Sequence, residues 1–323
     1  MRWISSLLVL AALFLVATFS LFESPSYEEE KIQRSAGPIG LPLGPYNQQL
    51  WWIPVESIGD TARQLLLETM VYAPSGQGPF PLVILNHGKP TPGSDLRSIR
   101  PGFDAAAHWF VDRGFIVAVP LRRGYGHSQG AVADMAGTCA TLNYVATANQ
   151  TAIDIESVIG FMTRQSIVDQ RNVVVVGHSH GGFGALGVAA DAFKGVVGVV
   201  NFAGGTGFWR PSTGWQWIRR IVQGKICNGS QNFLAALAQL GEQNSVTQVW
   251  LYAENDELFN PELAQEMLNA YEKKSRFPIF FISLPPSPSN GHMLFAEDAV
   301  TSWAPAVNGF LKKLHIPGYL AGD

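Results

Sequence analysis

The feature that most constrains the fold is the segment 177–182, which reads G-H-S-H-G-G and directly follows the apolar run 173–176. A stretch with helical spacing, rich in alanine and glycine, follows it at 183–193. A buried strand, a sharp turn and a helix in this order leave the hydroxyl of Ser179 exposed at the end of the strand. Glycines are needed because a Cβ in the turn would crowd the neighbouring strand and helix. We interpret Ser179 as a nucleophile; the alternative is a glycine turn with a purely structural role.

Strand-like and helix-like segments alternate along the middle of the chain. Short apolar runs predict strands, and apolar residues spaced three or four apart predict helices. This alternation specifies right-handed βαβ units, so we expect an α/β fold with a mostly parallel sheet and helices on both faces. The expected strands are an antiparallel edge hairpin at 50–55 and 64–72, then 81–85, 116–120, 173–176, 196–201, 247–253 and 278–284; the expected helices are 103–112, 144–164, 183–193, 231–240 and 262–274.

Two polar loops downstream of the turn carry further candidates. The predicted strand 247–253 runs into E-N-D-E, which contains Asp256, and the loop after the next strand contains His292. No other histidine lies between Asp256 and the last helix. An imidazole can take the proton of a serine hydroxyl and return it to a leaving group, while a carboxylate fixes its tautomer. We therefore predict His292 as the general base; the alternative is a solvated loop histidine.

Two loops upstream also carry motifs. The predicted strand 81–85 runs into N-H-G-K-P, and acyl transfer needs backbone N–H donors directed at a developing oxyanion. The second motif, R-G-Y-G-H-S-Q-G at 123–130, follows the predicted strand 116–120, and we interpret it as structural.

The four motifs resemble, in type and order, those of the α/β-hydrolase superfamily, over nearly all of residues 45–318. Within the superfamily the chain is similar to exported bacterial hydrolases related to dienelactone hydrolases and prolyl-oligopeptidase-type esterases. Dienelactone hydrolases proper have a cysteine nucleophile where this chain has Ser179. Their specific substrate is therefore not implied.

The resemblance implies the order serine, acid, histidine, and it selects the acid. In this family's turn the acid lies three residues beyond the strand end and a proline opens the next helix, which implies Asp256 with Pro261. Glu254 and Glu257 flank Asp256 and are the alternatives. We interpret both as solvated loop carboxylates.

The resemblance also implies an oxyanion hole made of two backbone N–H groups. These belong to His180 and Lys89, with Gly88 as the alternative to Lys89. Because both donors act through the main chain, we assign no catalytic meaning to their side chains. The histidines around Ser179 are not expected to bind a metal ion, since no further ligand stands at a suitable spacing.

An irregular insertion at 204–245 separates two predicted strands. Connections at the carboxyl ends of the strands surround the site in this kind of fold, so the insertion is a candidate substrate lid. The alternative is a packed cap that only covers the core. It contains Phe208, Trp209, Trp215 and Trp217, followed by the predicted helix 231–240.

Cys139 and Cys227 are the only cysteines of the chain. An exported protein meets an oxidising compartment, where such a pair tends to be bridged. We predict a disulfide that holds the insertion to the body of the domain; the alternative is two separate buried thiols.

The first 22 residues indicate export. Met1-Arg2 gives a positive start, and residues 3–22 carry no charge. This stretch is a cleaved signal peptide or, because its 20 residues approach the length that spans a bilayer, an N-terminal anchor that attaches the protein to the membrane. We expect a linker at 23–45, a hydrolase domain at 46–318, and a periplasmic, secreted or membrane-anchored protein.

Composition excludes some classes of function. The chain has 323 residues, of which 47% are hydrophobic and 15% charged, enough to bury a large core. A net charge of −3 gives no electrostatic footprint for nucleic acid. We expect a serine hydrolase that cleaves a small-molecule carboxylic ester through an acyl-enzyme and needs no cofactor. The alternatives are a peptidase or amidase with the same residues, or a non-catalytic binding protein on this scaffold.

Overall fold

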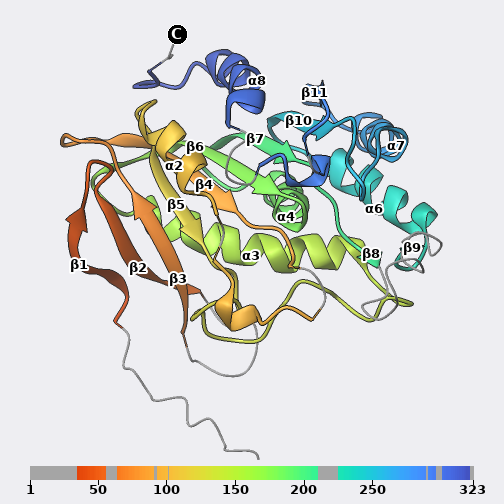
Figure 1. Cartoon of the computed structure of the whole chain (residues 1–323), viewed down its shortest axis with the longest axis horizontal. Coiled ribbons are helices and arrows are strands. Elements are labelled where there is room, and N and C mark those ends of the chain that lie inside the picture. Colours follow the sequence, from red (N-terminus) through yellow and green to blue (C-terminus); the bar gives the residue numbers. More distant parts are fainter. Residues whose placement is uncertain are drawn as a thin grey trace, which may run out of the picture. The chain divides into compact units, whose positions relative to one another are not determined.

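A nine-stranded sheet organises the chain from Ala36 onward (Figure 1). The structure, a computed structural model, describes residues 35–55, 64–90, 93–100, 102–209, 225–288, 290–295 and 300–320. The predicted export segment 1–22 and most of the predicted linker lie outside these residues. None of the helices within the described ranges has the length and apolar character needed to cross a membrane.

The sheet is mostly parallel, which confirms the predicted α/β class. Its first three strands and β5 pair antiparallel, and all further pairs are parallel. The order across the sheet is β1 (Gly37–Leu43), β2 (Gln48–Val55), β3 (Leu65–Tyr72), β5 (Ile116–Pro120), β4 (Phe80–Asn86), β6 (Val168–His178), β7 (Val196–Phe202), β10 (Thr247–Ala253) and β11 (Ile279–Leu284).

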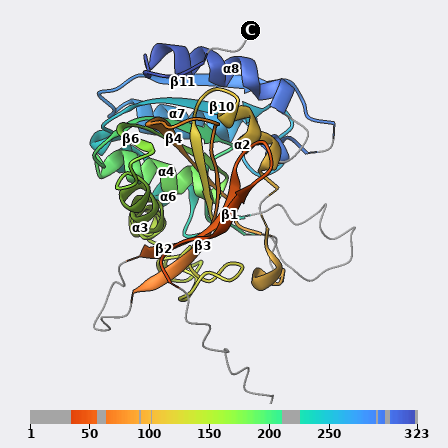
Figure 2. The same cartoon turned by 90° about the vertical axis from the view of Figure 1, so that its left-hand side faces the viewer.

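Helices cover both faces of the sheet. On one side lie α3 (Tyr144–Met162) and α4 (His180–Ala190), and on the other α2 (Asp104–Val111) (Figure 2). Val173 and Val175 of β6 face the first side, whereas Val174 and Val176 face the second. A run of valines suits such a strand because both of its faces are buried. The other helices are α6 (Ser230–Gln243), α7 (Pro261–Glu272) and α8 (Val300–Lys313).

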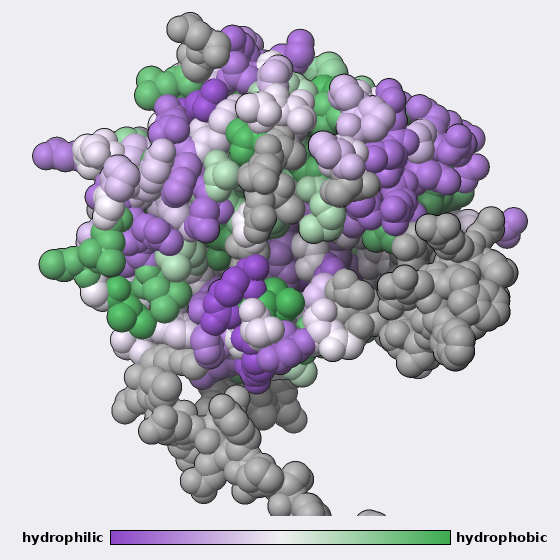
Figure 3. Space-filling model, viewed as in Figure 1, coloured by the Kyte–Doolittle hydropathy of each residue, from purple (hydrophilic) through white to green (hydrophobic). Residues whose placement is uncertain are grey.

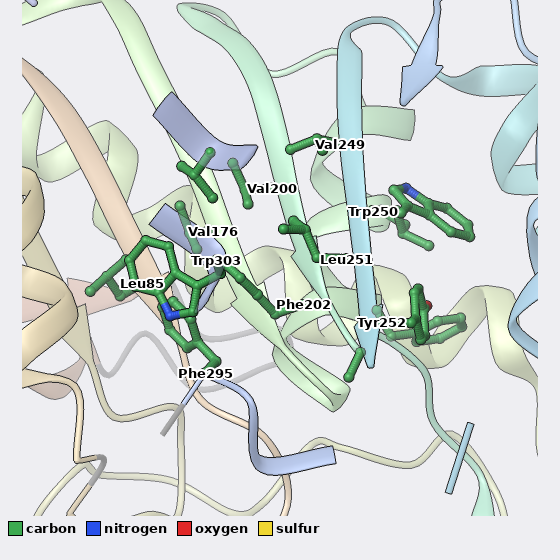
Figure 4. Packing of buried hydrophobic residues seen from close by; sticks show 14 of the residues in the cluster. Leu85, Val176, Val200, Phe202, Val249, Trp250, Leu251, Tyr252, Phe295 and Trp303 are labelled. Carbon is green, nitrogen blue, oxygen red and sulfur yellow. The ribbon is translucent and has the colours of Figure 1, made fainter. Parts of the chain in front are cut away.

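In β10, too, successive side chains face opposite sides of the sheet, and here the side chains are larger. Val249 and Leu251 lie with Trp303 of α8 in the cluster shown in Figure 4, and Trp250 points the other way. The Trp250 ring lies 5.1 Å from that of Tyr271 in α7. Burial of aromatic groups on both faces therefore fixes the register of β10, and with it the position of the loop that follows.

Strand β1 corrects the sequence prediction, which assigned residues 37–43 to a linker. It pairs with β2 at the edge of the sheet, and its Ile39, Leu41 and Leu43 are 50%, 84% and 72% exposed. Apolar surface along this edge is visible in Figure 3. Pro38 and Pro42 remove backbone donors from the edge, which disfavours pairing with another chain. The same prolines gave the segment the composition of a linker.

Glu156 of α3 is a half-buried carboxyl on the α3 and α4 side of the sheet. Burial, and then the neighbouring Asp191 carboxyl, raises the pKa of Glu156 to about 8. The folded protein therefore binds a proton here that the unfolded chain releases at lower pH.

We expect the free energy of unfolding to depend on pH through Glu156. A carboxyl whose pKa is raised in the folded state contributes stability at low pH that is lost as the pH rises toward the folded value. Urea unfolding at pH 5 and pH 9 should show a larger loss in the wild type than in Glu156→Gln, whose side chain does not titrate. Equal losses in the two proteins would contradict the role given to Glu156.

Candidate active site

The turn that carries Ser179 is built on unusually close backbone contacts. A Cβ on Gly177 would lie 2.3 Å from the Gly181 carbonyl oxygen, and one on Gly181 would lie 2.3 Å from that of Asn86 in β4. Ser179 itself has φ 53° and ψ −120°, a region that favours glycine. Its N–H donates to the Phe202 carbonyl at 2.9 Å, which ties the strained residue to β7. Ser179 thereby stands between β6 and the first turn of α4.

Three predicted site residues meet at this turn. The Nε2 atom of His292 lies 3.0 Å from Ser179 Oγ, and its Nδ1 lies 3.0 Å from Asp256 Oδ2. All three side chains are buried or nearly so. Since a carboxylate only accepts, Nδ1 carries the proton toward Asp256 and Nε2 is left to accept the serine proton. The arrangement can make the Ser179 oxygen nucleophilic.

Asp256 is fixed by its own loop after β10. Its Oδ1 accepts backbone N–H groups of Leu258 and Phe259 at 2.7 and 2.9 Å, so that Oδ2 is left to face His292. Glu254 and Glu257, the alternatives for the acid, are exposed. The structure thus brings Asp256 to the histidine.

The loop after β11 holds His292 against the Asp256 loop. Asn255 donates to the Ser287 carbonyl and accepts the Ser287 N–H, at 2.8 and 2.9 Å. Asn290 accepts the N–H of His292 at 2.8 Å. These amide side chains position the histidine, and the sequence pattern did not single them out.

His178 is a further site residue that sequence reasoning passed over. Its Nε2 donates to the His292 carbonyl at 2.6 Å, and its ring centroid lies 5.1 Å from that of His292. Burial, and then the neighbouring His292, lowers the pKa of His178 to about 4, so it is neutral at pH 7. It holds the backbone of the predicted base, His292, a contact that is visible only when β6 and the C-terminal loop are placed together.

The predicted oxyanion donors lie on both sides of Ser179. His180 is the first residue of α4, and Gly88 approaches so closely that a Cβ on it would lie 3.0 Å from Ser179 Cβ. Lys89 follows with an exposed side chain. Among the described residues, no acceptor takes the backbone N–H of Gly88 or Lys89. Two segments that could stabilise an oxyanion therefore flank the serine.

The insertion begins and ends on the body of the domain. The structure joins Cys139 and Cys227 in a disulfide, with an S–S distance of 2.04 Å. The Cys227 N–H donates to the Gly207 carbonyl at 2.8 Å, and the Tyr144 hydroxyl donates to the Cys227 carbonyl. Strands β8 (Phe208–Trp209) and β9 (Lys225–Ile226) pair at this base. Trp215 and Trp217 lie outside the described residues, so the lid stays a prediction.

The described ranges contain no group of three or more histidine, cysteine or acidic side chains that could hold a metal ion.

Comparison with known proteins places these features in a family. A family model described as X-Pro dipeptidyl-peptidase (S15 family) matches residues 64–279. No curated protein matches the chain.

Solved structures with this fold include esterases and peptidases. The acetyl xylan esterase of Paenibacillus sp. R4 has a TM-score of 0.57 at 14% identity, with 89% of this chain and 90% of that chain covered. The esterase Pf2001 of Pyrococcus furiosus has a TM-score of 0.55 at 14% identity, with 83% and 90% covered. Dipeptidyl peptidase 4 of Porphyromonas gingivalis has the same score and identity, but this chain spans only 35% of its length. The α/β-hydrolase fold expected from the motifs is confirmed.

The close contact at Gly181 can be tested by adding one methyl group. Gly181→Ala should lower the free energy of unfolding by about 3 kcal/mol, because its Cβ meets backbone atoms that cannot move aside independently. Gly309→Ala is the matched control, since nothing lies within 4 Å of its Cβ in α8. There the free energy of unfolding should rise by up to about 1 kcal/mol, from helix propensity. Similar effects at the two positions, measured by urea unfolding, would refute the close contact.

Proposed function

The chain belongs to the X-Pro dipeptidyl-peptidase (S15) family and is a serine hydrolase, and we propose that it cleaves carboxylic esters through an acyl-enzyme on Ser179. The observation that carries the proposal is the continuous contact from Ser179 Oγ to His292 Nε2 and from His292 Nδ1 to Asp256 Oδ2, each 3.0 Å long. Neither the base nor the acid has another side-chain partner that would compete for these atoms among the hydrogen bonds of the described residues.

In the acylation step Ser179 Oγ attacks the ester carbonyl while His292 Nε2 takes its proton. The carbonyl oxygen becomes an oxyanion, and we expect the N–H groups of His180 and Lys89 to stabilise it. Asp256 stabilises the imidazolium that forms. Collapse of the intermediate breaks the bond to the alcohol oxygen, and His292 returns the proton to that leaving group.

Deacylation repeats the sequence with water. His292 takes a proton from a water molecule, the resulting hydroxide attacks the acyl carbon, and Ser179 leaves with the proton restored. The products are a carboxylic acid and an alcohol. The enzyme ends in its starting state, so the proposed cycle needs no cofactor.

The state of the buried carboxylates favours an ester over a dipeptide substrate. An enzyme that removes dipeptides has to bind a free terminal ammonium group, which calls for an unpaired carboxylate near the nucleophile. The buried carboxylates of the described residues, Asp134, Asp154 and Asp256, are all engaged, by Arg122, Arg123 and His292 in turn. The chain also spans 90% of each of the two esterases named above.

The family description itself favours a second candidate, cleavage after an X-Pro dipeptide by the same residues. The two functions are separated by assaying purified protein on p-nitrophenyl acyl esters and on X-Pro p-nitroanilides. We expect turnover of the esters, with a chain-length series identifying the preferred acyl group. Higher kcat/KM on the anilides would favour the peptidase and refute the ester proposal.

We also propose that the protein acts outside the cytoplasm. The disulfide between Cys139 and Cys227 is of the kind that persists in oxidising compartments. The uncharged residues 3–22 support export, either with cleavage or as an anchor.

Replacement of the nucleophile tests the whole assignment. Ser179→Ala should lower kcat on the order of 10⁶-fold where chemistry limits turnover, and it should abolish labelling by a fluorophosphonate. The fold should be retained, because the backbone strain of the turn does not depend on the hydroxyl. Activity within tenfold of the wild type would rule out Ser179 as the nucleophile.

Replacement of the acid tests which carboxylate orients His292. Asp256→Asn should lower kcat on the order of 10⁴-fold, since an amide can hold the imidazole in the wrong tautomer. Glu257→Gln, one position along the same loop, is the control and should cost far less. A larger loss in the Glu257 variant would reassign the acid.

A further inference from the structure

Behind the proposed site lies a buried polar cluster centred on Arg122 and Asp134, whose side chains are 1% and 3% exposed. The guanidinium donates from Nε to Asp134 Oδ1 at 3.2 Å and from Nη2 to Oδ2 at 3.3 Å. Tyr125 donates its hydroxyl to the same Oδ2. Two charges are removed from water here, which is costly unless the pairing is complete.

Arg122 holds the loop that carries one oxyanion donor. Its guanidinium also donates to the carbonyl oxygens of His87 and, at 3.5 Å, of Gly88. In a trans peptide unit the N–H points away from the C=O. The N–H groups of Gly88 and Lys89, which share peptide units with these two carbonyls, therefore point away from Arg122. In an extended strand successive N–H groups would point to opposite sides.

The His87 side chain also holds this loop through hydrogen bonds. Its Nδ1 donates to the Gly88 carbonyl at 2.7 Å, and its Nε2 accepts the backbone N–H of Arg122 at 3.2 Å. Burial, and then the Arg122 charge, lowers the pKa of His87 to about 3, so the ring stays neutral with one defined tautomer.

Asp134 also reaches the second donor, through the His180 side chain. His180 Nε2 lies 3.4 Å from Asp134 Oδ1 and 2.9 Å from Thr151 Oγ1. The Thr151 hydroxyl donates to the Thr147 carbonyl, so His180 Nε2 carries a proton and Nδ1 accepts from the Thr206 hydroxyl at 2.7 Å. The ring is thus fixed from α3, from the loop after β7 and from Asp134. The His180 side chain, to which the sequence assigned no catalytic meaning, is thus part of the buried cluster.

We propose that the buried Arg122–Asp134 pair is a positioning device for the oxyanion hole, setting the peptide units at residues 87–89 and the first residue of α4 in one geometry. The inference rests on the proposed acyl transfer at Ser179. Arg122 and Asp134 do not touch the substrate; they act through the backbone that does.

The next residue in sequence supplies a matched control. Arg123 forms a second buried pair with Asp154 of α3, at 2.5 Å from Nε to Oδ1, and its Nη2 donates to the Gln150 carbonyl at 3.1 Å. None of the hydrogen bonds of this pair among the described residues reaches residues 87–89. Asp134→Asn and Asp154→Asn therefore remove the same charge from neighbouring arginines, and only the first loosens the oxyanion loop.

Two measurements separate positioning from general damage. The first is the second-order rate of Ser179 labelling by a fluorophosphonate, whose P=O oxygen occupies the oxyanion hole whatever bond the enzyme cleaves in nature. The second is the ratio of kcat/KM for a p-nitrophenyl ester and its thionoester, since sulfur is a poor acceptor for N–H donors and an intact hole prefers oxygen.

For Asp134→Asn we expect labelling to slow roughly 10- to 100-fold, and the ester preference to fall by a similar factor, less than the loss of a whole donor. Asp154→Asn should keep both values within about twofold, because its pair does not touch the hole. Equal effects of the two variants, at matched urea stability, would overturn the proposal.

Tyr125→Phe covers the case in which Asp134→Asn does not fold. It removes one hydrogen bond to Asp134 and leaves the ion pair in place, so a smaller fall of the ester preference is expected. An unchanged preference in this folded variant would also overturn the proposal.

If wild-type protein is not labelled at all, the proposed serine chemistry fails. If it is labelled but does not cleave esters, only the ester proposal fails, and the comparison of labelling rates between the variants still tests the positioning role.

Discussion

The close crossing of α4 over β4 and β6 is the contact on which the rest of the site depends. Gly177 and Gly181 allow backbones to meet at distances that a Cβ would forbid, and Asn86 of β4 lies at the same point. This crossing forces Ser179 into its strained conformation and brings Gly88 beside it. The predicted nucleophile and both segments of the proposed oxyanion hole are consequently parts of one backbone arrangement. Side-chain contacts refine this backbone arrangement, but the glycine contacts determine it.

Behind this backbone arrangement the protein places charged and polar groups rather than an apolar core. Burial alone would raise the pKa of the Asp134 carboxyl, but the Arg122 charge, with His180, holds it well below its usual value. The pair is therefore ionised over the ordinary pH range. The neutral rings of His87 and His178 bind the backbone carbonyls of Gly88 and His292. Such a layer is expensive to assemble, but it defines orientation more closely than apolar packing can.

Much of the fold could be predicted because its signals are local. The valine run of β6, the glycine turn and the alternation of strands and helices each lie within a short stretch of chain, and the sheet confirms them. Strand β1 could not be predicted, because prolines are tolerated in an exposed edge strand but are otherwise typical of linkers. The hydrogen-bond partners of His178, His180 and Arg122 could not be predicted either. Their hydrogen bonds join strands, helices and loops that are distant in sequence, so no spacing reveals them. The roles of Ser179, Asp256 and His292 remain predictions that their geometry supports.

The order of strands in the sheet also bears on how the molecule reaches its active form. Ser179 directly follows β6 in the centre of the sheet, whereas Asp256 and His292 lie on loops after β10 and β11, and the serine and histidine are 113 positions apart. Such distant contacts form only after the intervening chain has been ordered, which costs entropy before any contact is gained. An arrangement with only β4, β6 and β7 in place would already hold Ser179 in its turn, but it would lack the predicted base. The predicted catalytic contacts therefore require β10 and β11 to have joined the sheet, so a molecule without these strands is expected to be inactive.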